Sequence, residues 1–239
     1  RRIDEATAEI DVTGAWKAIG EPLRAGSEAD EDEFISLFDG ETLEGWTQRN
    51  GIATYRVEDE TIVGRTAVNS PNSFLCSDRA YTDFELIFEV QVDPGLNSGV
   101  QIRSRSSEDY NDERVHGPQV EIETAPGESG YIYGEATGRG WLSPNQKTKD
   151  GYVNDQWNEF RVLAVGPRVQ TWINGKPIED LTDEESSQCG FIGLQVHGVG
   201  DRGPFEVRWR NLKIRDLDPE KTEESQGVQF TPTPDVAEK

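Results

Sequence analysis

The 239-residue sequence contains only two cysteines, two histidines and no methionine. With Cys76 and Cys189 alone, the chain cannot form a framework of disulfide bridges, a zinc ribbon or a CxxC redox motif. One disulfide and two buried free thiols fit these two positions equally well. No apolar run approaches the roughly 18 residues that a membrane span requires, so the sequence predicts no such span.

Basic residues are scarce: Lys and Arg total 24 against 46 Asp and Glu, a formal net charge of -22. Nucleic acids and anionic membrane surfaces both attract basic surfaces, so this balance excludes them as main partners. Half of the charge lies near the ends, with a net of -6 in residues 1–33 and -5 in residues 216–239. We therefore predict a partly ordered acidic segment at 1–33, one folded domain at 34–217 and a solvated acidic tail at 218–239.

Helical periodicity is also missing, since no such pattern exceeds about two turns. Six Trp, six Tyr and nine Phe nevertheless indicate a core. Residues 84–92 alternate apolar and polar, and two β-rich runs at 157–165 and 169–173 are joined by Gly166-Pro167, a hairpin signal. Strands punctuated by Gly, Pro and Asn in this way predict an all-β jelly-roll sandwich of two antiparallel sheets.

Three predicted strands carry a row of polar side chains on one face, because residues i and i+2 of a strand share a face. The rows are Gln101, Arg103 and Arg105; Gln119, Glu121 and Glu123; and Gln195 and His197. One interpretation is that these are solvent faces of antiparallel strands. The rows contain no Lys, however, and their amide, guanidinium and carboxylate groups offer the paired donors and acceptors that sugar hydroxyls need. If the strands are neighbours, the rows form a polar floor for a carbohydrate.

A glycine-rich aromatic loop at 130–141 accompanies these strands. Its Tyr133 and Trp141 could stack on a pyranose ring, or pack beneath the loop. Asn97 stands before the first polar strand, where it could hold a turn or present its amide to a ligand. His197 lies in a polar row and is followed by Gly198, which favours a role in a site over a purely structural one.

Several motifs follow one another in an order that resembles the 3-keto-disaccharide hydrolase domain family. They are residues 36–46, 81–86, 97–103, 157–158, 172–175, 193–198 and 210–211. The resemblance spans about 34–217. It implies a concanavalin A-like fold and an enzyme that cleaves the glycosidic bonds of 3-keto-glycosides. In such a substrate the C3 ketone acidifies the hydrogen on C2. A base can remove that hydrogen, the aglycone can leave C1, and water can then add back.

The resemblance also implies roles for the polar rows. His197 or Glu121 would be the base, and Arg103 would hold the ketone oxygen or stabilise the enolate. The family commonly places Glu before Gln in the central strand, whereas here Gln119 precedes Glu121. The predicted substrate-binding residues are Asn97, Gln101, Gln119, Glu123, Tyr133, Trp141 and Gln195.

Three other functions stay open from the sequence. An ordinary glycosidase needs two carboxylates, and Glu121 and Glu123 would lie about 7 Å apart on one face, within the inverting range. A lectin-like carbohydrate-binding module would use the same polar rows without catalysis. A structural domain of a larger surface assembly would use the acidic ends as tethers.

No cofactor is certain from the sequence. His197 and Glu121 with a water could hold a divalent metal such as calcium, although no Asp-x-Asp-x-Asp loop is present. The resemblance implies an extracytoplasmic location of bacterial type, periplasmic or secreted. The sequence begins Arg1-Arg2 and shows no signal peptide. It does not indicate an oligomeric state.

Overall fold

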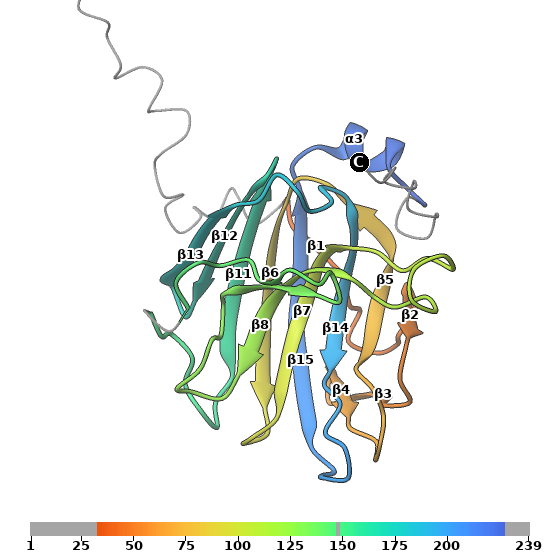
Figure 1. The fold of residues 1–239 in the computed structure, drawn as a ribbon, viewed down its shortest axis with the longest axis vertical. Helices are drawn as coiled ribbons and strands as arrows, with labels where there is room; N and C mark the ends of the chain where they lie inside the picture. The colour runs from red at the N-terminus through yellow and green to blue at the C-terminus, as the bar shows by residue number, and fades with distance from the viewer. Residues whose placement is uncertain (1–32, 147–148, 228–239) are drawn as a thin grey trace, which may run out of the picture. The chain divides into compact units, whose positions relative to one another are not determined.

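The computed structural model of the chain describes residues 33–146 and 149–227. Within these residues, strands form two antiparallel sheets that pack face to face (Figure 1). The all-β sandwich predicted from the sequence is therefore confirmed. The predicted partly ordered segment at 1–33 lies outside the described residues, apart from its last residue.

The first sheet has eight strands within the described part of the chain. In chain order they are β1 (Ile35–Ser36), β3 (Thr54–Glu58), β4 (Thr61–Arg65), β6 (Phe84–Val92), β11 (Asn158–Val165), β12 (Arg168–Ile173), β13 (Lys176–Thr182) and β15 (Glu206–Asp216). Their spatial order is β13-β12-β11-β6-β15-β4-β3, and β1 also pairs with β15.

The second sheet has seven strands among the same residues and carries the predicted polar rows. Its strands are β2 (Trp46–Arg49), β5 (Ser73–Tyr81), β7 (Asn97–Ser104), β8 (Gly117–Glu123), β9 (Ile132–Glu135), β10 (Gly140–Trp141) and β14 (Gly190–Val196). Their spatial order is β10-β9-β8-β7-β14-β5-β2, so the polar strands β8, β7 and β14 are neighbours.

The core lies between the sheets and is made by the apolar side of each alternating strand. Phe88 and Phe160 of the eight-stranded sheet stack with ring centroids 5.2 Å apart, and both are fully buried. Val100, Val120 and Leu194 face them from the seven-stranded sheet and are also fully buried. Each such side chain contributes about 1.5–3 kcal/mol by leaving water. The same alternation turns the polar rows to the outer face of the seven-stranded sheet.

Turn signals in the sequence predict the strand connections well. Gly166-Pro167 joins β11 to β12, with Val165 paired to Arg168 as expected for a tight hairpin. A bulge follows Trp209 in β15: the β15–β6 register shifts between Arg210 and Lys213, and Asn211 has a φ of 52°.

The prediction of a solvated tail from residue 218 is wrong for residues 218–227. Asp218 caps the short helix α3 (Pro219–Glu224), accepting a hydrogen bond from the Lys221 backbone N–H. Thr222 is fully buried and lies 2.9 Å, oxygen to oxygen, from the Thr82 hydroxyl. The Gln226 side chain pairs with both the N–H and the C=O of Ala80.

No helix in the described part of the chain is long and apolar enough to span a bilayer.

Both cysteines are free thiols, so the structure excludes the disulfide; Cys76 is buried as the second alternative requires, whereas Cys189 is only half-buried. Cys76 is buried on the outer face of the seven-stranded sheet, in a small apolar cluster with Phe74, Val115 and Phe191. Burial in this cluster raises the pKa of the Cys76 thiol, which keeps it protonated.

Candidate active site

The polar rows lie side by side on the outer face of the seven-stranded sheet. The register pairs Gln195 with Gly99 and Gly99 with Glu121. One step along, Gln101 pairs with Gln119, which in turn pairs with Tyr133. Side chains from β14, β7, β8 and β9 thus form the continuous polar floor that the sequence predicts only if these strands are neighbours.

This floor is not a solvent face. Gln101 and Gln195 are 0% exposed, Gln119 is 2% exposed and Glu121 is 6% exposed. Chain segments coloured yellow-green and green cross the strands β7 and β14 in Figure 1. Because buried amides and carboxylates need hydrogen-bond partners, the floor must satisfy its groups internally or through a ligand.

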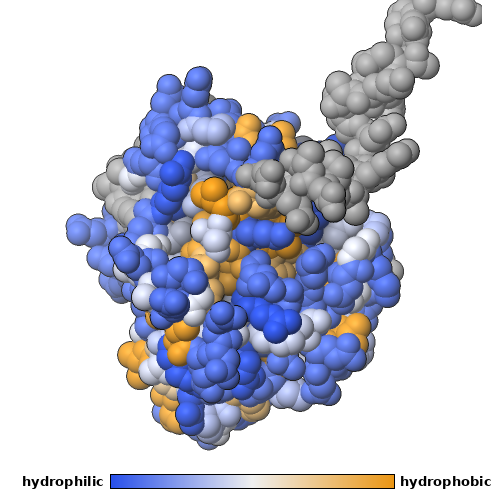
Figure 2. All heavy atoms as spheres, turned by 180° about the vertical axis from the view of Figure 1, so that it is seen from behind, coloured by the Kyte–Doolittle hydropathy of each residue, from blue (hydrophilic) through white to orange (hydrophobic). Residues whose placement is uncertain are grey.

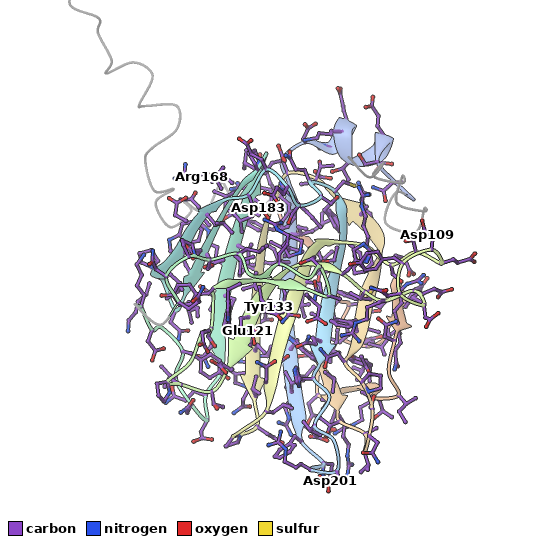
Figure 3. The ribbon with its side chains drawn as sticks, viewed as in Figure 1. Asp109, Glu121, Tyr133, Arg168, Asp183 and Asp201 are labelled. Atoms are coloured by element: carbon purple, nitrogen blue, oxygen red, sulfur yellow. The ribbon has the colours of Figure 1, made fainter. Side chains whose placement is uncertain are left out.

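A cavity of about 460 Å³ opens above the floor, within the size range of small-molecule sites. It is lined by seven of the ten residues predicted for the site: Asn97, Gln119, Glu121, Tyr133, Trp141, Gln195 and His197. Figure 3 shows Glu121 and Tyr133 close together over the middle of the sandwich, away from Arg168 and Asp183 at one end and Asp201 at the other.

A chain of amides orients the floor toward Glu121. The Glu121 carboxylate accepts hydrogen bonds from the Asn97 side-chain amide and, at 3.0 Å, from Gln119 Nε2. This turns Gln119 Oε1 away from Glu121. The Oε1 atom instead accepts hydrogen bonds from Gln101 Nε2 and Gln195 Nε2, each at 2.8 Å. Gly99 makes room for this arrangement, because a Cβ there would lie 2.4 Å from the Gln119 side chain.

Glu121 is a buried carboxylate without a counter-charge. Its side-chain partners are amides, and no lysine or arginine of the described residues forms an ion pair with it. Burial raises the pKa of Glu121 from its ordinary value near 4.5 to about 7, although the hydrogen bonds from Asn97 and Gln119 oppose this rise. A carboxylate with this pKa can take up and release a proton near neutral pH.

His197 lines the cavity, and one of its ring nitrogens is bonded to the backbone. Its Nδ1 lies 2.8 Å from the Gly198 carbonyl oxygen, which can only accept, so Nδ1 carries a hydrogen. The Nε2 atom is therefore the nitrogen that can take or give a proton. Asn72 Oδ1 accepts from the Gly198 N–H at 2.9 Å, which fixes this turn next to the cavity.

Sequence reasoning missed four lining residues: Asn72, Arg114, Glu135 and Ala136. Asn72 Nδ2 donates to Glu135 Oε1 at 3.3 Å, although three strands separate β5 from β9 in the sheet. The end of β9 therefore reaches across the polar floor. Arg114 joins from the loop 105–116, with Nη2 2.6 Å from the same Glu135 oxygen. Only Glu135 and Ala136 had a signal, since both lie in the glycine-rich aromatic loop at 130–141.

Two aromatic rings stand at the edge of the cavity. Tyr133 and Trp141 meet edge to face, with centroids 5.3 Å apart and planes at 76°. Trp141 is 37% exposed, whereas most large apolar side chains of the domain are buried. An exposed indole beside polar groups suits the apolar face of a sugar ring.

The comparison with protein families agrees with this geometry. Residues 33–215 match the model of the 3-keto-alpha-glucoside-1,2-lyase-like domain. The chain belongs to this family. The family resemblance predicted from the sequence motifs is therefore confirmed. No curated protein sequence matches the chain significantly.

Solved structures share the fold of this lyase-like domain. A putative glycosyl hydrolase from Parabacteroides distasonis is 21% identical with a TM-score of 0.61, over 82% of this chain and 99% of that one. The carbohydrate-binding module CBM66 from Bacillus subtilis is 19% identical with a TM-score of 0.51, over 72% and 95%. A Bacillus subtilis protein of unknown function with a galectin-like fold is 12% identical with a TM-score of 0.53, over 73% and 90%.

One predicted catalytic residue of the lyase-like domain lies elsewhere. Arg103 has a φ of 49°, and the β7–β14 register shifts beside it, so a bulge turns its side chain off the polar row. Its guanidinium bonds the Thr82 carbonyl at 2.6 Å and Asp83 at 3.0 Å, and it is 3% exposed. Burial lowers the pKa of Arg103 to about 10. Arg103 therefore fastens the turn between β5 and β6 and does not line the cavity.

Two predicted substrate-binding residues are also outside the cavity lining. Gln101 lies beside Gln119 on the neighbouring strand, donates to it and receives a hydrogen bond from the Ser104 hydroxyl at 2.7 Å, so it supports the floor. Glu123 accepts a hydrogen bond from the Glu128 N–H and closes a turn. Since Glu123 does not line the cavity, the pair Glu121 and Glu123 does not form the two-carboxylate site of an ordinary glycosidase.

His197 and Glu121, which the sequence suggested as metal ligands, line the same cavity. Within the described ranges, no group of three or more His, Cys, Asp or Glu side chains could hold a metal ion. Both Glu121 oxygens are already engaged by amide donors. A divalent ion such as calcium stays a prediction.

Proposed function

We propose that the protein cleaves the glycosidic bond of 3-keto-glycosides by elimination and rehydration, with Glu121 as the base. The observation that carries the proposal is a buried carboxylate with no counter-charge, held by two amides in a polar cavity, whose pKa is about 7. A structural carboxylate at this depth would be paired with a cation. Membership of the lyase-like family and an exposed tryptophan at the cavity edge support a carbohydrate substrate.

Each step moves one proton or breaks one bond. Glu121 takes the hydrogen on C2, and the electron pair of that bond forms an enolate with the C3 oxygen. The enolate collapses, the bond from C1 to the glycosidic oxygen breaks, and that oxygen receives a proton. Water then adds its oxygen to C1 and a proton returns to C2. The sum is hydrolysis, with a free 3-keto sugar and the aglycone as products.

We assign the second proton transfer to His197. Its Nδ1 is committed to the Gly198 carbonyl, so the imidazolium form can give a proton only from Nε2. Glu121 has two amide donors against its oxygens, an arrangement that suits the ionised base. The amides of Asn97, Gln119 and Gln195 line the cavity and are proposed to bind hydroxyls.

A change of leaving group distinguishes the role of the acid, His197, from that of the base, Glu121. A nitrophenolate leaves without protonation, whereas a sugar alkoxide needs an acid. We expect His197→Ala to retain most activity on a nitrophenyl 3-keto-glucoside and to lose about 10²–10⁴-fold on a 3-keto-disaccharide. Equal losses on both substrates would show that His197 is not the acid.

The first experiment is to incubate the protein with a 3-keto-glucoside and with its unoxidised parent. We expect aglycone release from the keto form alone, because only its C2 hydrogen is acidic. Release from neither compound, together with measurable binding of both, would support a lectin-like module instead. Release from both would indicate an ordinary glycosidase. An extracytoplasmic location is proposed with this function and stays a prediction.

A further inference from the structure

The proposed reaction places negative charge on the C3 oxygen, and Arg103 does not reach the cavity. Among the described residues that line the cavity, Arg114 alone carries a permanent positive charge. Preorganised donors at a developing oxyanion are commonly the largest single contribution to catalysis. The position and attachments of Arg114 therefore decide whether it can serve the enolate.

The Arg114 guanidinium is held at one corner and open at the others. Its Nη2 donates to Glu135 Oε1 at 2.6 Å, and Glu135 is 7% exposed. The guanidinium also lies 5.9 Å from the Phe74 ring centroid. No other side-chain hydrogen bond of Arg114 occurs within the described residues, so Nε and Nη1 keep donors for a ligand. A planar guanidinium fixed in this way can offer two parallel N–H groups to one oxygen.

Glu135 is itself anchored to the far side of the cavity. Its Oε1 also accepts from Asn72 Nδ2 at 3.3 Å, and Asn72 Oδ1 binds the Gly198 N–H beside His197. Arg114 is therefore connected through two side chains to the turn that carries the proposed acid. This chain of contacts spans the cavity and gives Arg114 a defined place relative to His197.

The loop 105–116 is built to hold Arg114 over the floor. Paired backbone hydrogen bonds between Arg105 and His116 close its base, as in an Ω-loop. Asn50 bonds the Glu113 carbonyl at 3.0 Å and the Val115 N–H at 2.8 Å, one residue on each side of Arg114.

The same loop carries local backbone strain next to Arg114. Asn111, Asp112 and Glu113 have consecutive φ values of 44°, 55° and 58°. A residue other than glycine is strained in this left-handed region, and such strain gathers at functional sites. The Tyr110 hydroxyl donates to the Ala136 carbonyl at 2.6 Å. This hydrogen bond fastens the loop 105–116 to the segment that follows β9.

We propose that Arg114 is a catalytic residue that donates hydrogen bonds to the C3 ketone oxygen and stabilises the enolate. This inference rests on the proposed function. When Glu121 takes the C2 proton, the C2–H electron pair becomes the C2–C3 double bond and the carbonyl electrons move onto the C3 oxygen. Arg114 neutralises that charge without itself losing a proton. Glu135 is then a positioning residue that orients the guanidinium.

The test isolates enolisation from bond cleavage. A 3-keto-1-deoxyglucose has the acidic C2 hydrogen and no leaving group, so exchange of that hydrogen in D2O reports proton abstraction alone. We expect Arg114→Ala to lose about 10²–10³-fold in C2 exchange. Added guanidinium, compared with sodium at equal ionic strength, should restore at least tenfold of that loss. A structural defect would not respond to guanidinium in this way.

Two matched variants control the test. Arg168 lies on the other sheet, in an exposed ion pair with Asp180, and Arg168→Ala should exchange at the wild-type rate with no response to guanidinium. Arg114→Lys keeps the charge but loses the planar fork, and it should fall between wild type and Arg114→Ala. If Arg114→Ala does not fold, the lysine variant carries the test alone.

The outcomes separate the inference from the function on which it rests. A wild-type protein that neither exchanges the C2 hydrogen nor releases aglycone overturns the proposed function. A wild-type protein that does both, with Arg114→Ala and Arg114→Lys within threefold of it, overturns the role of Arg114. Loss of exchange in Arg114→Ala with no recovery in guanidinium also overturns it.

Discussion

Both sheets bury a carboxylate on the face turned away from the core, and the surroundings of the two carboxylates differ. Glu85 of the eight-stranded sheet is 2% exposed and contacts the guanidinium groups of Arg161 and Arg215. Glu121 of the seven-stranded sheet is 6% exposed, and within the described residues its carboxylate accepts side-chain hydrogen bonds from two amides and forms no ion pair. Glu85 and Glu121 are buried to a similar degree, but Glu85 is paired with positive charges and Glu121 with neutral amides.

The difference separates a structural carboxylate from one available for chemistry. Two arginines neutralise Glu85 and tie β6 to β11 and β15, the strands on either side of it. Figure 2 shows the molecule from the side opposite to that seen in Figure 1, and on this side hydrophilic and hydrophobic residues lie next to one another on the surface. Glu121 instead stands in a cavity where neutral amides hold it, and its charge is not compensated. A protonation change at Glu121 is therefore accessible near neutral pH.

The largest effect expected from this comparison is on catalysis. Glu121→Gln keeps the shape and the amide contacts but removes the base, so the rate of aglycone release should fall by roughly 10²–10⁴-fold. Glu123→Gln, two residues along the same strand and outside the cavity lining, is the matched control and should stay within threefold. Steady-state kinetics on a 3-keto-glucoside measures both, and equal losses would contradict the assignment.

Glu85→Gln should lower stability and leave activity unchanged, the reverse of the result expected for Glu121→Gln. It removes the charge of a buried carboxylate from between two half-buried guanidinium groups, so the free energy of unfolding should fall by about 3–5 kcal/mol. The folded protein should keep its activity. Chemical denaturation gives the stability, and a loss below about 1 kcal/mol would show that the ion pairs on this face do not carry the structural role assigned to them.

The pH dependence of stability distinguishes Glu121 further. Its pKa is raised in the folded state, from near 4.5 to about 7, so the folded protein holds the proton more tightly than the unfolded one. Stability must then fall as pH rises from about 4.5 through 7. Relative to Glu121→Gln, the wild type should lose at most about 3 kcal/mol across this range. Parallel denaturation curves of the two proteins at about pH 4 and pH 8 measure this loss, and a constant difference would contradict the pKa shift.

The smallest expected effect concerns the aromatic edge. Trp141→Ala removes a stacking surface and leaves the floor intact, so KM should rise about fivefold, near 1 kcal/mol, with kcat little changed. Val165→Ala removes an exposed apolar side chain from the other sheet and serves as control. A drop in kcat without a change in KM would place Trp141 among the groups that act on the transition state.

The fold and most of the floor follow from sequence patterns of period two. Alternation places Gln119 and Glu121 on the face opposite Val120, and glycine or proline turns separate the strands. The error at Arg103 has a physical cause, because alternation fails at a bulge and no glycine or proline of β7 lies next to Arg103 to mark it. Helix α3 spans six residues, too few for a periodic signal.

Contacts made through crossing segments could not be predicted from local patterns. Asn72, Arg114 and Glu135 come from a turn, a loop and a strand end that are far apart in sequence and in sheet order. Their meeting depends on the path of two covering segments over the floor. The sequence around Arg114 has no alternation, and its one buried aliphatic residue, Val115, is too little to reveal this path.

The most direct test of the central claim is cleavage of a 3-keto-glucoside in D2O, followed by analysis of the sugar product by NMR. Elimination and rehydration with Glu121 as base predict one deuterium on C2 of the product. A control with the 3-keto sugar in enzyme-free buffer corrects for spontaneous exchange. Cleavage that leaves the original hydrogen on C2 would contradict the account.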